Sequence, residues 1–329
     1  MYINHRLRKR MPRTKPDKLI ASYLYMPIFF TFLLLLVNTS VIAQTENMAS
    51  TPLLLGKPKL LASYFDYLHG KKTTKNNVNF SITSLMENNT STGHAFSILD
   101  HSYSDITSLL NSMENWCIAV IVNVNIKTCT YEHGTNDSKY LSLYVEDEHY
   151  VTPENAYHIR YRYENFRQAK DYLLVKMDAK DGPYDTGDYL FIVEIIPLGE
   201  NRSFIHLAYS AHFGLISRIL LNTYLATIGR NKFGFTVIDQ NKDGQAKYIT
   251  GIKAIMERNT ARYLLAFQTY LETLSISPEN RFMASLKRWH SYTKLFKPQL
   301  YELNEADYLS NKQKEFGNQQ ALQYRLLED

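Results

Sequence analysis

The sequence lacks the short motifs that identify many enzymes and cofactor-binding proteins. It has no His-Glu-x-x-His zinc motif, no Gly-x-Ser-x-Gly nucleophile motif, no phosphate-binding loop and no dinucleotide-binding glycine signature. We therefore predict no catalytic residue, no cofactor and no resident metal. Catalysis stays open as an alternative, because acid and base side chains can converge from distant segments.

Two partial metal patterns fail on inspection. Residues 239–244 read Asp-x-Asn-x-Asp-Gly, as at the start of a calcium loop, but Thr250 stands where a bidentate Glu is needed and Lys247 stands at the ninth position. A polar hairpin loop is the favoured interpretation. His206 and His212 share one face of a predicted strand, but about 20 Å separates them, which is too far for one ion.

The sequence also lacks a basic excess outside its first 43 residues. Of the 37 Lys and Arg residues, seven lie in residues 1–43, and of the 32 Asp and Glu residues one does. The remaining 286 residues therefore carry 30 basic and 31 acidic groups. Because the basic excess is confined to that segment, nucleic acid is excluded as a partner.

Residues 1–43 have the layout of an export signal. A basic stretch from Arg6 to Lys18 precedes an apolar run, residues 28–37, and small residues Val41 and Ala43 stand before a predicted cut at Gln44. The alternative is an uncleaved anchor, because no charged residue occurs from residue 19 to residue 43. Both interpretations place the rest of the chain across the membrane, in the periplasm if the source is Gram-negative.

Two cysteines, Cys117 and Cys129, follow in the part predicted to be exported. Disulfides persist in such compartments, so we predict a bridge between them. The Cα atoms of a disulfide lie within about 7 Å, so the chain between must fold back, near residues 123–125. Two buried reduced thiols are the alternative, and two cysteines alone are too few for a zinc site.

The pattern of apolar residues predicts an α+β fold. A helix at residues 60–68 precedes strands at residues 80–87 and 94–99 and a helix at residues 105–115. Tyr157, Ile159, Tyr161 and Tyr163 then alternate with charged residues, as in a sheet with one solvated face, and short turns continue the antiparallel meander to residue 211.

A helix at residues 215–228 and a strand pair at 233–237 and 247–249 follow this meander. The longest amphipathic segment, residues 251–274, predicts a long helix, and two further helices are expected at residues 278–296 and 304–316. We divide the chain into a leader at 1–43, an N-terminal segment at 44–79, a main domain at 80–275 and a helical extension at 276–329.

Three phrases carry a family resemblance: Gly-His-Ala-Phe-Ser-Ile-Leu-Asp-His at 93–101, residues 224–230 with 234–237, and Glu-Arg-Asn-Thr-Ala-Arg-Tyr at 257–263. Together with the order of elements, they resemble the START-like (SRPBCC) helix-grip superfamily and a group of exported proteobacterial proteins of uncharacterised function. The resemblance covers about residues 80–274. It implies a curved antiparallel sheet that grips the long helix around an apolar cavity for lipid-like ligands, and it implies no reaction.

The main hypothesis is a noncatalytic, exported binding protein for a lipid or another hydrophobic small molecule. Arg258 and Arg262, four residues apart, could hold an anionic head group, and ordinary ion pairs on an exposed face are the alternative. The other hypotheses are an enzyme, cyclase-like or hydrolytic, acting on a hydrophobic substrate, and an envelope scaffold tethered by the leader. The predicted cavity residues are Tyr157, Tyr161, Tyr163, Val175, Met177, Leu207, Tyr209, Arg258, Arg262, Tyr263 and Phe267.

Overall fold

The structure, a computed structural model, describes residues 53–328 except 77 and 228. The predicted leader, with its cut before Gln44, therefore lies outside the described residues. The described residues all belong to one compact unit. Across the described ranges, every helix is too short or too polar to cross a membrane.

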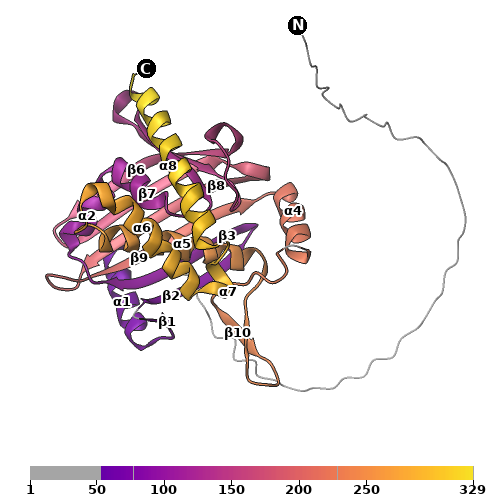
Figure 1. The fold of residues 1–329 in the computed structure, drawn as a ribbon. Helices are drawn as coiled ribbons and strands as arrows, with labels where there is room; N and C mark the ends of the chain where they lie inside the picture. The colour runs from indigo at the N-terminus through magenta and orange to yellow at the C-terminus, as the bar shows by residue number, and fades with distance from the viewer. Residues whose placement is uncertain (1–52, 77, 228, 329) are drawn as a thin grey trace, which may run out of the picture. The chain divides into compact units, whose positions relative to one another are not determined.

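Nine strands form one antiparallel sheet in the order β1-β2-β3-β9-β8-β7-β6-β5-β4 (Figure 1). Two meanders, β1 to β3 and β4 to β9, meet where β3 pairs with β9. The chain crosses from the centre of the sheet to its far edge between β3 and β4. The strands are β1 Thr73–Lys75, β2 Val78–Glu87, β3 Thr90–Leu99, β4 Ile126–His133, β5 Lys139–Val145, β6 Tyr157–Ala169, β7 Tyr172–Asp181, β8 Thr186–Pro197 and β9 Ser203–Phe213.

The alternation predicted for the meander sets the two faces of the sheet. In β6, Ile159, Tyr161 and Tyr163 are buried, whereas Arg160 and Arg162 are exposed. In β9 the odd-numbered residues, such as Leu207, join the main hydrophobic core, whereas Phe204 and Ala208 join a second cluster on the opposite face. The sheet therefore has an inner face and an outer face, both covered where β8 and β9 run.

The inner face carries helices α2 (Tyr103–Asn111), α3 (Met113–Val120) and α5 (Gly251–Glu272). The long helix α5 lies against β2, β3 and β9. Gly93 of β3 permits this contact, because a Cβ there would lie 2.3 Å from the hydroxyl oxygen of Thr260 and 3.0 Å from the Met256 carbonyl. The predicted α+β architecture, a sheet packed on one long helix, is confirmed.

The outer face is covered by α1 (Gly56–His69), which packs Leu60 and Tyr67 against Ile192 and Phe204. A carboxylate holds the start of this helix. The backbone N–H groups of Leu55 and Gly56 donate to Glu194 of β8, at 2.9 and 2.6 Å. A buried carboxylate at a helix N-terminus satisfies donors that have no partner inside the helix.

Three C-terminal helices, α6 (Pro278–Leu295), α7 (Lys297–Leu300) and α8 (Glu305–Glu328), complete the unit. The last helix is longer than predicted, and it is tied to β4 by buried charges. Glu315 pairs with Lys312 at 2.6 Å and with Lys127 at 3.3 Å, and Lys312 also donates to the Ile126 carbonyl. The domain boundaries predicted at residues 79/80 and 275/276 stay a prediction.

The disulfide prediction is confirmed. Cys117 of α3 and Cys129 of β4 are bridged, with Cα atoms 5.0 Å apart, and the chain turns back between them. The single helix predicted at residues 105–115 is instead two helices. Ser112 separates them, because its hydroxyl caps α3 by accepting from the Asn115 N–H. Trp116 lies inside α3 and is buried.

The segment between β9 and α5 holds a helix, α4 (Leu215–Ala226), and a small hairpin of β10 (Val237–Gln240) and β11 (Ala246–Tyr248). The hairpin turn is the calcium-like phrase. Its Asn241 side chain accepts from the N–H groups of Asp243 and Gln245, and Gly244 adopts φ +75°. The polar-turn interpretation is therefore confirmed.

Candidate functional site

Side chains fill the middle of the inner face. Trp116 is buried, and its ring packs edge-on against Phe191 and Phe267, with centroids 5.7 and 4.9 Å away. Its indole N–H donates to the Leu110 carbonyl at 3.0 Å. Beside it, between the sheet, α3 and Tyr263 of α5, only a void of about 10 Å³ remains. The centre of the sheet therefore has no room for a ligand.

An apolar pocket of about 460 Å³ lies at one end of this core, between α4, the start of α5, and strands β8 and β9. This volume is within the range of small-molecule sites, roughly 300–1,000 Å³. Two lining residues, Tyr184 and Leu220, are each about half exposed, so the pocket opens to solvent at this rim. Its lining is Pro183, Tyr184, Thr186, Tyr189, Tyr209, Ala211, Phe213, Ser217, Leu220, Leu221, Tyr224, Ile255, Met256 and Asn259.

Local sequence positions the walls of this apolar pocket. A short 3₁₀ turn, Pro183–Asp185, precedes β8, and Asp185 ties it to α4. The Asp185 carboxylate accepts from the N–H of Ile216, and its backbone carbonyl accepts from the N–H of Gly214. These two hydrogen bonds join the turn and the helix into one wall, while the small side chain of Ala211 in β9 lies at the floor.

Polar groups in the apolar pocket are hydroxyls and one amide. Tyr189 and Tyr209 lie at its inner end, with ring centroids 6.2 Å apart, and the Tyr189 hydroxyl bonds Thr186 at 2.6 Å. Burial raises the pKa of Tyr189 and raises the pKa of Tyr209 well above its ordinary value. Both phenols therefore keep their protons. These protons are already engaged, the Tyr189 O–H with Thr186 and the Tyr209 O–H with Tyr161, so each phenol oxygen can only accept a hydrogen bond from a ligand O–H or N–H.

The predicted cavity residues do not share one cavity. Tyr209 lines the apolar pocket, whereas Tyr161, Met177 and Tyr263 line the small central void. Tyr157 lines neither space, but its ring centroid lies 4.7 Å from that of Tyr184, which lines the apolar pocket. The rest of the predicted apolar set is packed in the core: Tyr163, Val175, Leu207 and Phe267.

Arg258 and Arg262 face the C-terminal helices. Both guanidinium groups pair with Glu302, Arg262 at 2.8 Å, and Arg258 also donates to the Gln299 carbonyl at 2.6 Å. Burial lowers the pKa of Arg262 to about 10. In the alternative interpretation, ordinary ion pairs on an exposed face, the ion pairs are present but the exposed face is wrong, because both side chains are buried. Their ion pairs hold α5 to the segment after α7, and neither residue is in the lining of the apolar pocket.

Sequence patterns gave little sign of the walls formed by α4 and by residues 183–186. The one available signal was in α4, whose residues 215–226 are apolar at most positions and so have no polar face to give to water. Such a helix needs apolar surroundings on more than one side. Ser217 is its one buried residue.

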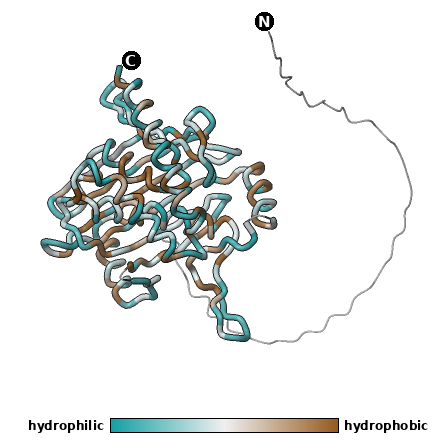
Figure 2. The backbone as a smooth tube through the Cα atoms, viewed as in Figure 1, coloured by the Kyte–Doolittle hydropathy of each residue, from teal (hydrophilic) through white to brown (hydrophobic). Residues whose placement is uncertain are grey.

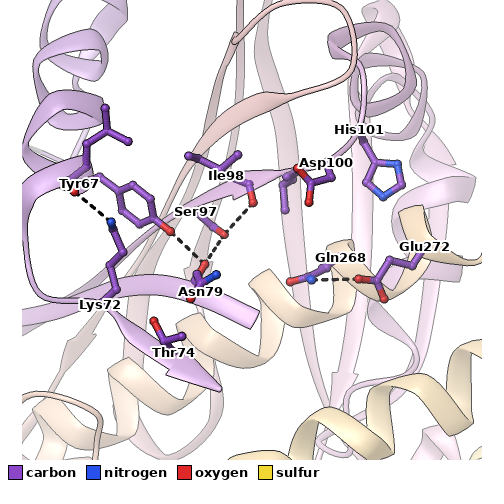
Figure 3. A pocket seen from close by; sticks show the side chains of 12 residues that line it. Tyr67, Lys72, Thr74, Asn79, Ser97, Ile98, Asp100, His101, Gln268 and Glu272 are labelled. Atoms are coloured by element: carbon purple, nitrogen blue, oxygen red, sulfur yellow. Dashed lines mark hydrogen bonds between the residues drawn. The ribbon is translucent and has the colours of Figure 1, made fainter. Parts of the chain in front are cut away.

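A second pocket, of about 620 Å³ and with a polar lining, lies at the other end of α5. Figure 3 shows Gln268 and Glu272 of α5 on one side and Tyr67 and Lys72 on the other. Glu272 is already engaged, since it accepts hydrogen bonds from Gln268 and Tyr292 and pairs with Arg288 at 2.7 Å. The remaining lining is Leu68, Thr74, Asn79, Ser97, Ile98, Leu99, Asp100 and His101.

A buried polar cluster lies on the outer face. His206 bonds Glu194 through Nδ1 at 2.9 Å and His94 through Nε2 at 3.0 Å, and Tyr172 donates to Glu194 at 2.7 Å. Burial, together with His206, lowers the pKa of His94 to about 3, so its imidazole is neutral. All four members are buried, so this cluster holds α1 in place and offers no open site.

Metal-binding groups gather at one place in the described part of the chain. Asp147, Glu148 and His149 lie together in the loop after β5. His149 Nδ1 already bonds the Asp147 carboxylate at 3.0 Å, and both side chains are exposed. Exposed loops of this kind commonly form such local bonds without an ion.

Comparisons with known proteins give weak similarities. No protein-family model matches the chain, and no curated protein matches it. A conserved protein from Geobacillus kaustophilus is similar over 55% of this chain and 95% of its own length, at 10% identity and TM-score 0.34. The Zhui aromatase/cyclase from Streptomyces sp. R1128 is similar over 56% and 94%, at 11% identity and TM-score 0.34.

Norcoclaurine synthase from Thalictrum flavum, solved with dopamine and hydroxybenzaldehyde, is similar over 45% of this chain and 81% of its own length, at 12% identity and TM-score 0.30. The enzymes in this comparison have helix-grip folds. Similarities of this size carry no argument about function. The fold of this chain is defined by its own strand order and by the packing of α5 on the sheet.

Proposed function

We propose that this protein binds a hydrophobic small molecule in the apolar pocket, without catalysis, outside the cytoplasm. The observation that carries the proposal is the pocket itself: about 460 Å³, open at one rim and lined almost entirely by aromatic and aliphatic side chains. Concave apolar sites with a few placed polar groups are typical of ligand binding. The hydroxyls of Tyr189 and Tyr209 and the amide of Asn259 supply those polar groups.

The composition of the lining favours binding over catalysis. Its residues include no carboxylate, histidine, lysine or arginine. General acid–base catalysis near neutral pH uses a group whose pKa is close to the operating pH. Because burial moves the pKa of Tyr189 and Tyr209 upward, away from that range, these phenols stay protonated and are poor general bases. An enzyme acting on a hydrophobic substrate is the weaker alternative.

Native mass spectrometry of gently purified full-length chain tests the proposal. We expect a noncovalent apolar passenger, and we expect the emptied protein to bind the neutral fluorophore N-phenyl-naphthylamine at one site. Ala211→Phe adds a ring to the floor of the pocket, and Leu220→Trp narrows its rim at a half-exposed position that tolerates bulk. Both variants should weaken fluorophore binding at least about tenfold.

Phe65→Trp on α1 is the matched control, because it adds an indole at an exposed site on the other face of the sheet. If the folded Leu220→Trp and Ala211→Phe variants bind the fluorophore as well as the parent does, the apolar pocket is not the site.

Export is part of the proposal and rests on the leader and the disulfide. A bridge between Cys117 and Cys129 is typical of a translocated protein. N-terminal sequencing of the protein from its native host should find Gln44 as the first residue. An intact leader would instead favour the tethered scaffold. Membership of the exported proteobacterial group stays a prediction.

A further inference from the structure

The helix α4 has apolar residues on two opposite sides. One side, with Ser217, Leu221 and Tyr224, lines the apolar pocket. The other side exposes Leu215 (63%), Ile216 (58%) and Ile219 (57%) to solvent. Figure 2 shows brown, hydrophobic segments along this helix, and Figure 1 places it at the side of the molecule. A helix that is apolar all round is normally covered on all sides.

The exposed side of α4 continues into the pocket. Leu220 is 46% exposed and also lines the pocket, so it joins the outer surface of the helix to the pocket rim. An apolar molecule that leaves the pocket at this rim reaches Leu220 first and the outer side of α4 next. The exposed residues therefore extend the apolar path beyond the pocket.

The segment that contains α4 carries basic residues and no acidic ones. Residues 214–238 contain Arg218, Arg230 and Lys232 and no Asp or Glu. Lys232 pairs with Glu302, whereas Arg218 and Arg230 have no ion pair in the described part of the chain; Arg218 bonds the Asn89 side chain instead. Asp185, the nearest carboxylate in the turn, is engaged with the Ile216 N–H.

From these observations we infer that α4 docks on an anionic lipid bilayer, with Leu215, Ile216 and Ile219 in the interface and Arg230 near the lipid phosphates. Aliphatic side chains buried at the headgroup boundary and cations close to anionic lipids each contribute to binding of this kind. A stable protein dimer normally buries about 800 Å² on each partner, more than four side chains of one short helix supply. This inference deepens the proposed function, since it names the surface from which the pocket would exchange its ligand.

The test places an environment-sensitive label on α4 in the full chain. The two native cysteines are bridged and buried, so Ile219→Cys provides a single free thiol for a nitrobenzoxadiazole label. With vesicles of equal parts phosphatidylglycerol and phosphatidylcholine, we expect the emission to shift to the blue and to be quenched by a spin-labelled lipid. Phe65→Cys on α1, equally exposed at 58%, is the control and should not respond.

The charge is tested separately. Arg230→Glu should raise the lipid concentration needed for half of the response at residue 219 by at least about fivefold, since each basic residue near an anionic surface contributes about that factor. Vesicles of phosphatidylcholine alone should give a weaker response that this substitution does not change.

Three results would overturn docking by α4. One is an unchanged emission at residue 219, and another is an equal response at residue 65, because the full chain also contains the apolar run at 28–37. The third is a blue-shifted emission at residue 219 before vesicles are added, which would mean that a second copy or another part of this chain covers the helix.

Failure of docking and failure of the proposed function give different results. The pocket variant Leu220→Trp should lose the fluorophore and keep the vesicle response at residue 219. A surface variant, Leu215→Ser with Ile216→Ser, should lose the vesicle response and keep the fluorophore. If Leu220→Trp keeps the fluorophore, the proposed function fails while docking can still hold.

Discussion

The long helix α5 borders a pocket at each end, and the two pockets differ in chemistry. Near its start, Ile255, Met256 and Asn259 face an apolar space without charged lining groups. Near its end, Gln268 and Glu272 face a polar space with Lys72 and Asp100. Between them the core is filled around Trp116. The difference teaches that volume alone does not identify a site, because in the larger, polar pocket Glu272 already bonds Gln268 and Asn79 already bonds Tyr67 and Ser97.

The largest expected effect comes from removing the indole of Trp116, which fills the core between the two pockets. Trp116→Ala should lower the free energy of unfolding by about 3–5 kcal/mol, because a fully buried indole is lost and a cavity remains. It should also add fluorophore capacity next to the apolar pocket. Urea unfolding and fluorophore titration measure the two effects.

Trp289→Ala is the control for that substitution. Trp289 is equally buried but belongs to a separate cluster among the C-terminal helices. It should cost similar stability and add no fluorophore capacity. An equal gain of capacity in both variants would mean that loosened packing, and not the central space, binds the fluorophore.

The next prediction concerns pH, which should change the free energy of unfolding but not the affinity for the fluorophore. The folded pKa of His94 is about 3, below its unfolded value of about 6.5, so the unfolded chain binds this proton first. Stability should therefore be complete above about pH 6.5 and fall below it, by up to about 1.4 kcal/mol per pH unit. The hydrogen bond and charge of His206 outweigh burial and lower the pKa of Glu194, which adds a loss in the same direction at lower pH.

Fluorophore affinity of the folded protein should stay constant from about pH 6 to pH 9, because burial keeps the lining phenols protonated. Urea titrations across the pH range, repeated with His94→Gln, measure the stability effect. A pH slope that persists unchanged in His94→Gln would assign it to other groups.

A smaller effect is expected in the polar pocket. Glu272→Gln removes the charge that pairs with Arg288 but keeps an acceptor for Tyr292. Because Arg288 is half exposed, the cost in unfolding free energy should be about 1 kcal/mol or less. Fluorophore affinity should not change. A loss of fluorophore binding in this variant would show that the two pockets are coupled through α5.

The smallest effect tests the polar groups inside the apolar pocket. Tyr209→Phe removes one hydroxyl and leaves the ring in place. The Tyr209 O–H is engaged with Tyr161, so its oxygen can act on a ligand only as an acceptor. We expect affinity for the neutral apolar fluorophore to change less than about twofold, whereas a ligand with a hydroxyl donor should lose about tenfold through one missing hydrogen bond. Isothermal titration of matched ligands with and without the hydroxyl measures the difference, and equal losses for both would contradict this role.

The sequence predicted the main sheet strands and the long helix because these elements depend on the spacing of apolar residues along the chain. The alternating tyrosines of β6, the long apolar stripe of α5 and the spacing of the two cysteines each follow a local rule. Strands β4 and β5 were not predicted. The burial of β4 depends on α8, almost two hundred residues away in the sequence. Tyr131, for example, exchanges two hydrogen bonds with Gln323.

The site was harder to predict than the fold, because a pocket is set by where packing stops. Tyr161 and Tyr209 look alike in the strand pattern, yet one faces a void of about 10 Å³ and the other a pocket of about 460 Å³. Trp116 makes the difference, since it fills the space in front of Phe191. Arg258 and Arg262 likewise gave no sign that Glu302, forty residues further on, would pair with them.

One wall of the apolar pocket comes from the segment between β9 and α5, and this affects how ligand choice can diverge. Leu220, Leu221 and Tyr224 belong to α4, outside the nine-stranded sheet and almost without buried residues. Substitutions there reshape the pocket while leaving the sheet and α5 intact. Exchanging this one helix is therefore the simplest route by which selection, or a protein engineer, can retune the preferred ligand.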